Sequence, residues 1–128
     1  QPVARVQAKH DGGTGGAKVP ADEAGGLDNH AYLSRGAKVM LTRNLWQAQG
    51  LVNATVETVE DVVWLPGSSR SDLPLAVLVS CPTYTGPTRW KTEPRPDFPD
   101  GIPIVPIPAV KSTFEHDGKN MSRTQTPL

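Results

Sequence analysis

Hydrophobic and polar positions alternate through residues 37–42, which gives the clearest periodic pattern in the chain. Ala37, Val39 and Leu41 would lie on one face of an extended backbone, and the residues between them on the other. A period of two residues is typical of a half-buried strand. The pattern therefore predicts a β-strand at this position.

Two later segments are apolar but less regular. In residues 52–63 four valines fall at helical spacing, yet the enrichment in Val and Thr favours extended structure, so we expect a strand and keep a helix as the alternative. Leu75 to Val79 form a short apolar run bounded by Pro74 and Pro82. Such a run predicts a strand buried on both faces.

Prolines dominate residues 94–108, where six of the fifteen positions are proline. Because proline has no backbone donor, we expect Ile102, Ile104 and Ile107 to lie on an edge strand or in polyproline geometry. A last strand is expected at 110–114. Five short strands separated by turns, with no convincing helix, predict a mainly β protein, namely a small antiparallel barrel with a Pro-rich loop.

The first 30 residues differ in composition from the rest. Six glycines interrupt a polar sequence with few large apolar side chains, which predicts a flexible Gly-rich lead-in. Order is expected to begin near Tyr32 and Leu33. We therefore divide the chain into a lead-in segment at 1–30 and a barrel domain at 31–128.

Charge and cysteine content narrow the possible functions. Thirteen basic and thirteen acidic side chains give a formal net charge of zero, so any contact with nucleic acid must come from a local patch. The single cysteine, Cys81, cannot form an internal disulfide, and the sequence shows no export signal, which favours an intracellular setting. The first methionine is Met40, and we expect the chain to be part of a longer protein.

Neither a catalytic nor a metal site is predicted. His10, His30 and His116 are widely separated, and with one cysteine they lack the paired spacing of zinc ligands. The glycine-rich run at 12–18 does not end in the Gly-Lys-Ser/Thr of a phosphate loop. We expect this chain to bind no cofactor and to be inactive as an enzyme on its own.

The residue order from Gly36 to Asp61 is more specific than the composition. It reads GAKVMLTRNLWQAQGLVNATVETVED. This segment resembles the inserted β-barrel of DNA helicases of the petite-integration-frequency (PIF) family, relatives of bacterial RecD, in which a strand reading roughly G-A-x-V-M-L-x-x-N-L is followed by G-L-V-N-G-T. Other segments that fit the family are His10–Gly13, Asp22–Leu27, Tyr84–Pro87, Val105–Ile107 and Arg123–Leu128.

The resemblance implies an SH3-like barrel inserted into a helicase motor, where it lies over the channel for single-stranded DNA. For the parent protein it implies ATP-dependent 5′-to-3′ DNA unwinding with ATP and Mg²⁺, in DNA repair, recombination or telomere maintenance. The implied partners are single-stranded DNA, bound weakly, and the remaining motor domains, with no membrane. The implied location is the nucleus or the mitochondrion.

The chain departs from the family pattern at three places. Relatives usually carry glycine where this chain has Ala54 and Glu57, and an aromatic-acidic sequence where it has Ser80 to Pro82. Glu57, Glu60 and Asp61 would repel phosphate, so we expect their strand to face away from DNA. These departures leave open a degenerate remnant of a mobile-element helicase.

Basic and aromatic side chains are interleaved in two places. The first group holds Arg35, Lys38, Arg43 and Trp46, and the second holds Arg89, Trp90 and Lys91. Proteins that bind single strands combine cations for the phosphates with rings on which bases stack. With the resemblance, the candidate DNA-binding residues are Lys38, Arg43, Asn44 and Asn53, with Trp46 as a stacking platform.

Two other interpretations remain open. The tryptophans could simply cover the barrel while the cations are solvated. Alternatively, the chain could be a stand-alone barrel that binds protein partners and uses Pro94 to Pro108 as a proline-rich ligand or an edge strand.

Overall fold

The computed structural model describes residues 4–12, 15–67 and 73–128, and it is mainly β, as the sequence predicts. The strands are β1 (Ala4–Gln7), β2 (Lys9–Asp11), β3 (His30–Leu33), β4 (Lys38–Met40), β5 (Val56–Val63), β6 (Ala76–Ser80), β7 (Trp90–Lys91), β8 (Pro103–Ile107), β9 (Val110–His116) and β10 (Lys119–Gln125). Three short 3-10 helices join them: η1 (Gly16–Lys18), η2 (Ala21–Glu23) and η3 (Gln47–Gln49). The described residues contain no α-helix.

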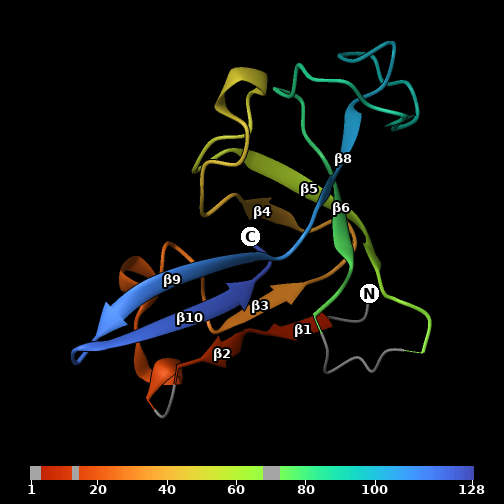
Figure 1. Ribbon diagram of the computed structural model, residues 1–128. Helices are drawn as coiled ribbons and strands as arrows, with labels where there is room; N and C mark the ends of the chain where they lie inside the picture. The colour runs from red at the N-terminus through yellow and green to blue at the C-terminus, as the bar shows by residue number, and fades with distance from the viewer. Residues whose placement is uncertain (1–3, 13–14, 68–72) are drawn as a thin grey trace.

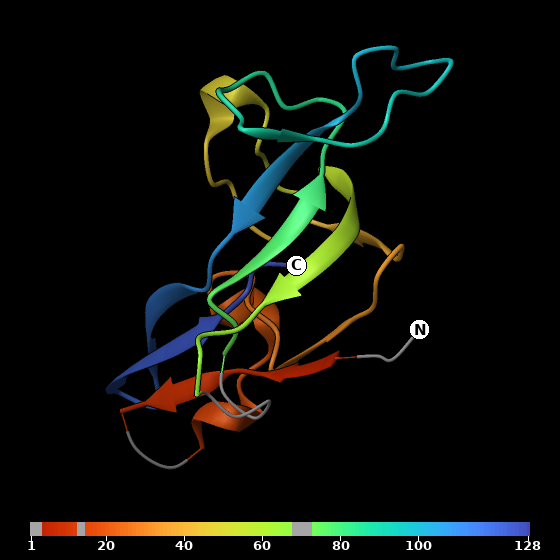
Figure 2. The same cartoon turned by 90° about the vertical axis from the view of Figure 1, so that its right-hand side faces the viewer.

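The strands form three antiparallel sheets, with the orders β4-β5-β6-β8-β7, β2-β10-β9 and β1-β3. In Figure 1 the five-stranded sheet lies above the β9–β10 hairpin and the N-terminal strands, and the turned view in Figure 2 shows the same two levels. Among the described strands the pairing forms open sheets and no closed barrel, so the SH3-like barrel stays a prediction.

One apolar core joins the two levels of the molecule. Val6 of β1 and Leu33 of β3 are fully buried in the same cluster as Val59 of β5, Val79 of β6 and Ile107 of β8. The core therefore spans elements from both ends of the chain and both sides of the fold. Burial of this apolar area is the main force that holds the sheets together.

The strand predictions near the middle of the chain are confirmed with one exception. Leu41 is buried and Val39 packs on the core, as the alternation predicts, and residues 56–63 form a strand rather than a helix. The exception is the run at 75–79. Leu75 is 52 % exposed and β6 alternates between buried and half-buried residues, so it is not buried on both faces.

The Pro-rich segment is built into the sheet more deeply than expected. β8 lies between β6 and β7, so it is not an edge strand over its whole length. However, β7 pairs only with Pro103 and Ile104, whereas β6 pairs with residues 104–107. Pro106 therefore lies where one side of β8 has no partner strand, and a missing backbone donor is tolerated there.

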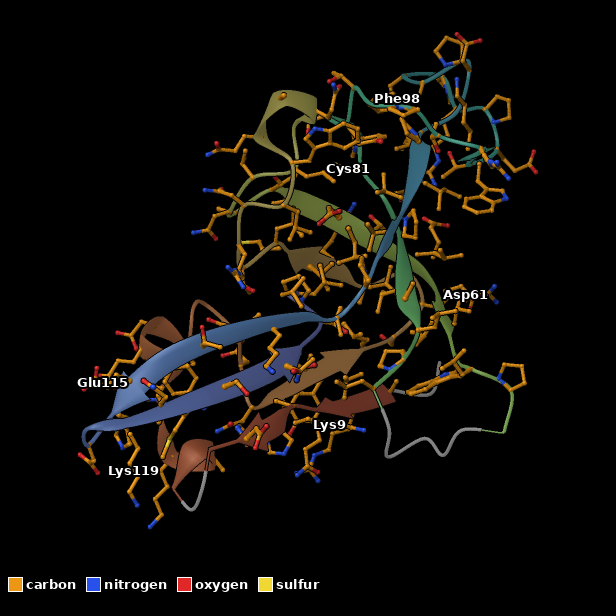
Figure 3. The ribbon with its side chains drawn as sticks, in the orientation of Figure 1. Lys9, Asp61, Cys81, Phe98, Glu115 and Lys119 are labelled. Carbon is orange, nitrogen blue, oxygen red and sulfur yellow. The ribbon has the colours of Figure 1, made fainter. Side chains whose placement is uncertain are left out.

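The strand expected at 110–114 is confirmed as β9, but the strand that follows it, β10, was not predicted from the sequence. β9 extends to His116, and β10 pairs with it along its full length through a turn at Asp117 and Gly118, whose φ angles are 51° and 74°. Positive φ at both positions is the geometry of a type I′ hairpin turn, for which Asp-Gly is a preferred sequence. That dipeptide is the signal that predicts the hairpin. Figure 3 shows Glu115 and Lys119 at its tip.

The expected flexible lead-in differs most from the structure. Of residues 1–30, only 1–3 and 13–14 lie outside the described residues. Strand β1 pairs with β3, and β2 pairs with β10 near the other end of the chain. Regular structure therefore begins well before residue 31, because partners far away in sequence supply the hydrogen bonds that the glycine-rich segment cannot make by itself.

Arg123 of β10 is the centre of this N-terminal packing. Its side chain is fully buried, and its two terminal nitrogens donate to the carbonyl oxygens of Leu27 (2.6 Å), Gly16 (2.9 Å) and Val19 (2.6 Å). Burial lowers the pKa of Arg123 from its usual range, and the nearby charge of Asp28 opposes that change. One guanidinium thus fixes three backbone positions of the lead-in.

Gln125 fixes the same segment two residues further along β10. Its amide nitrogen donates to the carbonyl oxygen of Val6 (3.0 Å) and lies within 3.2 Å of that of Asp28, while its own oxygen accepts from the Thr126 amide (2.9 Å). Alternate residues of a strand point to one face, so Arg123 and Gln125 act together.

We expect Arg123→Met to lower the free energy of unfolding by about 3 kcal/mol, because it leaves buried carbonyl groups without donors. Urea denaturation measures the loss, and hydrogen exchange at the Val19 and Leu27 amides locates it. Arg95→Met removes an exposed arginine and is the matched control. Equal stability of the two variants would contradict the assigned role of Arg123.

Candidate nucleic-acid interface

Two of the predicted DNA-binding residues meet in the connection between β4 and β5. The side-chain oxygen of Asn44 accepts a hydrogen bond from the backbone amide of Asn53 (2.8 Å), and the Ala54 amide donates to the Leu41 carbonyl (2.8 Å). Both asparagines are exposed. The hydrogen bond between Asn44 and Asn53 links the two sides of this connection. The Asn44 side chain therefore already has a partner within the chain.

Ala54 stands in this connection with a φ of 72°. Left-handed backbone is strained for alanine and comfortable for glycine, which has no Cβ. The glycine of the resembled pattern at this position therefore has a physical explanation. Alanine here keeps the turn and adds strain.

Lys38 and Arg43 lie in different surroundings. The Lys38 ammonium group donates to the Thr58 hydroxyl (2.8 Å) across the β4–β5 pair, on the exposed side. The half-buried Arg43 side chain passes over Gly25 and Gly26, where a Cβ on Gly26 would come within 3.5 Å of the Arg43 Cγ. The structure thus spreads these two cations over the β4 edge and the lead-in rather than clustering them.

Trp46 is held in place through its backbone. It forms an isolated antiparallel bridge with Leu51, in which each amide donates to the other residue's carbonyl at 3.0 Å around η3. Gly50 ends this turn at a φ of 88°, and a Cβ there would collide with the Thr83 carbonyl group. The indole is 44 % exposed, and its ring lies 6.4 Å from that of Tyr84.

The Trp46 loop is joined to the loop at 83–87. The Thr85 amide donates to the Gln49 carbonyl (3.0 Å), and the Thr85 hydroxyl donates to the Gln49 side chain (3.0 Å). The Tyr84 hydroxyl donates to the Pro87 carbonyl (2.7 Å), and its ring lies over Gly86, where a Cβ would meet the ring carbon Cζ at 2.6 Å. The two loops therefore form one fixed unit.

Two adjoining hollows cross this unit and together form a groove beside β8, which we call the β8 groove. The first, of about 570 Å³, is lined by residues that include Leu45, Trp46 and Leu51. The second, of about 420 Å³, is lined by residues that include Thr88, Arg89 and Trp90. Both share Tyr84, Pro87, Val105 and Pro106, so these four residues form the common floor.

Trp90 stands at the second end of the β8 groove. Its side chain is 53 % exposed, while its backbone is fixed by Thr88, whose hydroxyl lies 2.9 Å from the Trp90 carbonyl oxygen and 2.8 Å from that of Ile104. The Trp90 amide donates back to the same hydroxyl (3.3 Å). An exposed ring on a fixed backbone can receive a flat ligand with little loss of conformational freedom.

The five predicted site residues are therefore divided by the structure. Asn44 and Asn53 are brought together, Lys38 bonds to Thr58, and Arg43 lies over the glycines of the lead-in. Trp46 lines the β8 groove. The group around Trp90 was recognised in the sequence but not chosen as a site, and the floor residues were not predicted to belong to one. The Tyr-Thr-Gly-Pro sequence was the available signal, because it predicts a tight turn that could fix a ring.

The described residues contain no group of three or more His, Cys, Asp or Glu side chains arranged to hold a metal ion. Within the same part of the chain, no helix has the length and apolar character needed to cross a membrane.

The three acids of β5 differ in their environments. Glu57 is 1 % exposed on the inward face that it shares with Val59, and neither of its carboxyl oxygens has a hydrogen-bond partner. Glu60 accepts from the Ser80 hydroxyl (2.7 Å), and Asp61, labelled in Figure 3, accepts from the Val62 amide (2.8 Å). Burial raises the pKa of the Glu57 carboxyl to about 7.

We expect Ala54→Gly to raise the free energy of unfolding by about 1 kcal/mol, because glycine removes the strain of a left-handed residue. Denaturant unfolding measures the change. Ala48→Gly, in η3 of the same connection, is the control and should lower stability, since no positive φ is relieved there. A destabilised Ala54→Gly variant would contradict this account of the turn.

We expect stability to fall as the pH rises from about 4.5 to about 7 through Glu57. In this window the folded carboxyl keeps its proton while the unfolded one has lost it, so the folded state binds more protons. Glu57→Gln should remove this slope and stabilise the protein above pH 7, by on the order of 1–2 kcal/mol. Unfolding curves across the window measure it.

The matched control for this prediction is Glu115→Gln, which changes an exposed glutamate on β9. It should keep the pH dependence of the original chain. Parallel curves for the original chain and Glu57→Gln would show that Glu57 does not titrate in this way.

Comparisons with known proteins add no assignment to this geometry: no family model matches the chain, and a search of curated proteins finds no match.

Proposed function

We propose that this chain is the accessory β-domain of an ATP-dependent DNA helicase of the PIF type and that it contacts single-stranded DNA beside the motor. The observation that carries the proposal is the convergence of the resembling segments. The 36–61 segment, Tyr84–Pro87 and Val105–Ile107 all contribute to the β8 groove. Segments that resemble one family and meet at one surface support a shared functional reason for the resemblance.

The segment at 123–128 supports the same proposal in a different way. Arg123 and Gln125 hold the lead-in, and the Pro127 carbonyl accepts from the Thr42 amide (2.9 Å) next to the β4–β5 connection. Ala4 and Leu128 both pack against the main apolar core. The 123–128 segment therefore packs against the same core as the segments that form the β8 groove.

In this proposal the motor domains outside the chain bind ATP and Mg²⁺ and perform 5′-to-3′ translocation in the nucleus or the mitochondrion. The accessory domain closes over the strand. Lys38 and Arg43 supply charge for phosphates, Trp46 supplies a ring, and Asn44 and Asn53 shape the connection that presents them. An isolated domain with so few cations is expected to bind weakly.

The proline-rich protein-binding alternative has less structural support. Pro103 and Pro106 belong to β8, which is paired with β6, so this part of the segment is not free to act as a polyproline ligand. A degenerate remnant remains compatible with the buried Glu57 and the strained Ala54, and a binding measurement separates it from a working domain.

We expect fluorescence anisotropy to detect weak binding to an end-labelled thymidine oligonucleotide of about 15 nucleotides. Two phosphate contacts predict a loss of about sevenfold in affinity between about 50 and 200 mM salt. The double variant Lys38→Ala/Arg43→Ala should bind more weakly and with a smaller salt dependence, provided that its melting curve shows it is folded.

The charge-matched control is Lys9→Ala/Lys119→Ala, which removes two exposed cations from β2 and β10; both are labelled in the lower part of Figure 3, whereas Cys81, close in sequence to Tyr84, lies in the upper part. It should retain binding. Absence of binding by the folded original chain would refute the proposed DNA contact. Equal losses of affinity in both double variants would show that binding comes from general charge attraction and not from Lys38 and Arg43.

A further inference from the structure

We infer that the bases of a bound single strand stack in the β8 groove between Trp46 and Trp90, with Arg89 beside a phosphate, rather than along strand β4. This inference rests on the proposed function and goes further, because it names the surface that receives the bases. That surface differs from the one predicted from Lys38, Asn44 and Asn53.

The chemistry of the groove lining fits nucleic acid. Arg89 is the one charged side chain among the described residues that line the two hollows, and no acid is among them. The lining is otherwise mostly aromatic, aliphatic and proline, with an exposed indole at each end. Rings that stack on bases together with a cation for the backbone are the elements of sequence-tolerant single-strand binding.

The size of the groove also fits a ligand as large as a nucleic-acid base. The hollows of about 570 and 420 Å³ each fall within the range of sites that enclose small organic molecules, roughly 300–1,000 Å³. Tyr84 and Pro106 line both of them, so the two hollows adjoin between Trp46 and Trp90. A strand could therefore place successive bases along the groove.

The open side of β8 argues against an added peptide strand. Beyond Ile104 this side has no partner, but Pro106 offers no backbone donor there, and Pro108 follows it. A peptide that extends the sheet needs a regular row of donors and acceptors. A ligand recognised by stacking needs none, so the groove favours bases over an added strand.

The groove is fixed before a ligand binds. Gln49 joins the Trp46 loop to Thr85, Tyr84 is tied to Pro87, and Thr88 holds the backbone of Trp90. Fixed platforms avoid the cost of ordering loops on binding.

The test is titration of the full chain with an unlabelled thymidine oligonucleotide, followed by tryptophan fluorescence and by anisotropy competition. Trp90→Ala and Trp46→Ala should each weaken binding by about tenfold, since stacking contributes at that level. Trp90→Phe keeps a ring and should recover most of the affinity. Arg89→Ala should reduce both the affinity and its salt dependence.

Stacking also has a spectroscopic signature that a purely structural role would not produce. The oligonucleotide should quench the original chain, and quenching should decrease in both tryptophan variants even at saturation. Tyr32→Ala is the matched control, because Tyr32 is a 63 % exposed aromatic residue on β3 outside the groove. It should leave affinity and quenching unchanged.

The possible results distinguish failure of this inference from failure of the proposed function. If the folded original chain does not bind, the proposed function and this inference both fall. If it binds, but Trp90→Ala and Arg89→Ala behave like Tyr32→Ala, the inference is wrong and the proposed function stands. If a proline-rich peptide quenches the tryptophan fluorescence and the oligonucleotide does not, the groove is a peptide site and the inference is overturned.

Trp90 and Arg89 are exposed, so the variants at these two residues test the inference even if Trp46→Ala fails to fold.

Discussion

The buried guanidinium of Arg123 is the interaction on which the arrangement of this fold depends. A charge of this kind is costly to remove from water unless hydrogen bonds replace the solvent, and here three carbonyl groups of the lead-in do so. Its Nε atom has no hydrogen-bond partner, so the three terminal bonds carry the compensation. The lead-in and β10 are therefore mutually dependent: the segment supplies acceptors that Arg123 needs, and Arg123 supplies donors that the segment lacks.

Local patterns in the sequence predicted much of the fold but not this dependence. Alternation at 37–42 and valine enrichment at 56–63 correctly indicated strands, because strand formation there follows from the residues themselves. The glycine-rich composition of residues 1–30 correctly indicated a segment with little ability to fold alone. It could not reveal that Arg123, about a hundred positions away, would organise that segment. Likewise, the prolines of β8 indicated that one side of the strand would have no partner. They could not indicate that β7 would pair only with the beginning of β8.

The candidate site was predictable only in part for the same reason. The sequence grouped residues that are close together along the chain, such as Lys38, Arg43 and Trp46. The fold places them in different surroundings. The β8 groove instead comes from three separate segments whose contacts require a tertiary structure. Its Tyr84 floor depends on Gly50 and Gly86, positions where a side chain would collide with the neighbouring loop or ring. Composition could identify the rings and cations but not the surface on which they meet.

Two of the three departures from the resembled pattern, Ala54 and Glu57, act on stability through different physics. Ala54 adds backbone strain at an exposed turn, whereas Glu57 places a carboxyl without a partner in the interior. Neither residue lines the β8 groove. The groove is held by the bonds of Gln49, Tyr84 and Thr88, none of which involves Ala54 or Glu57. A chain weakened at these two positions can therefore keep the shape of the groove for as long as it stays folded, so loss of stability and loss of binding are separable properties of this domain.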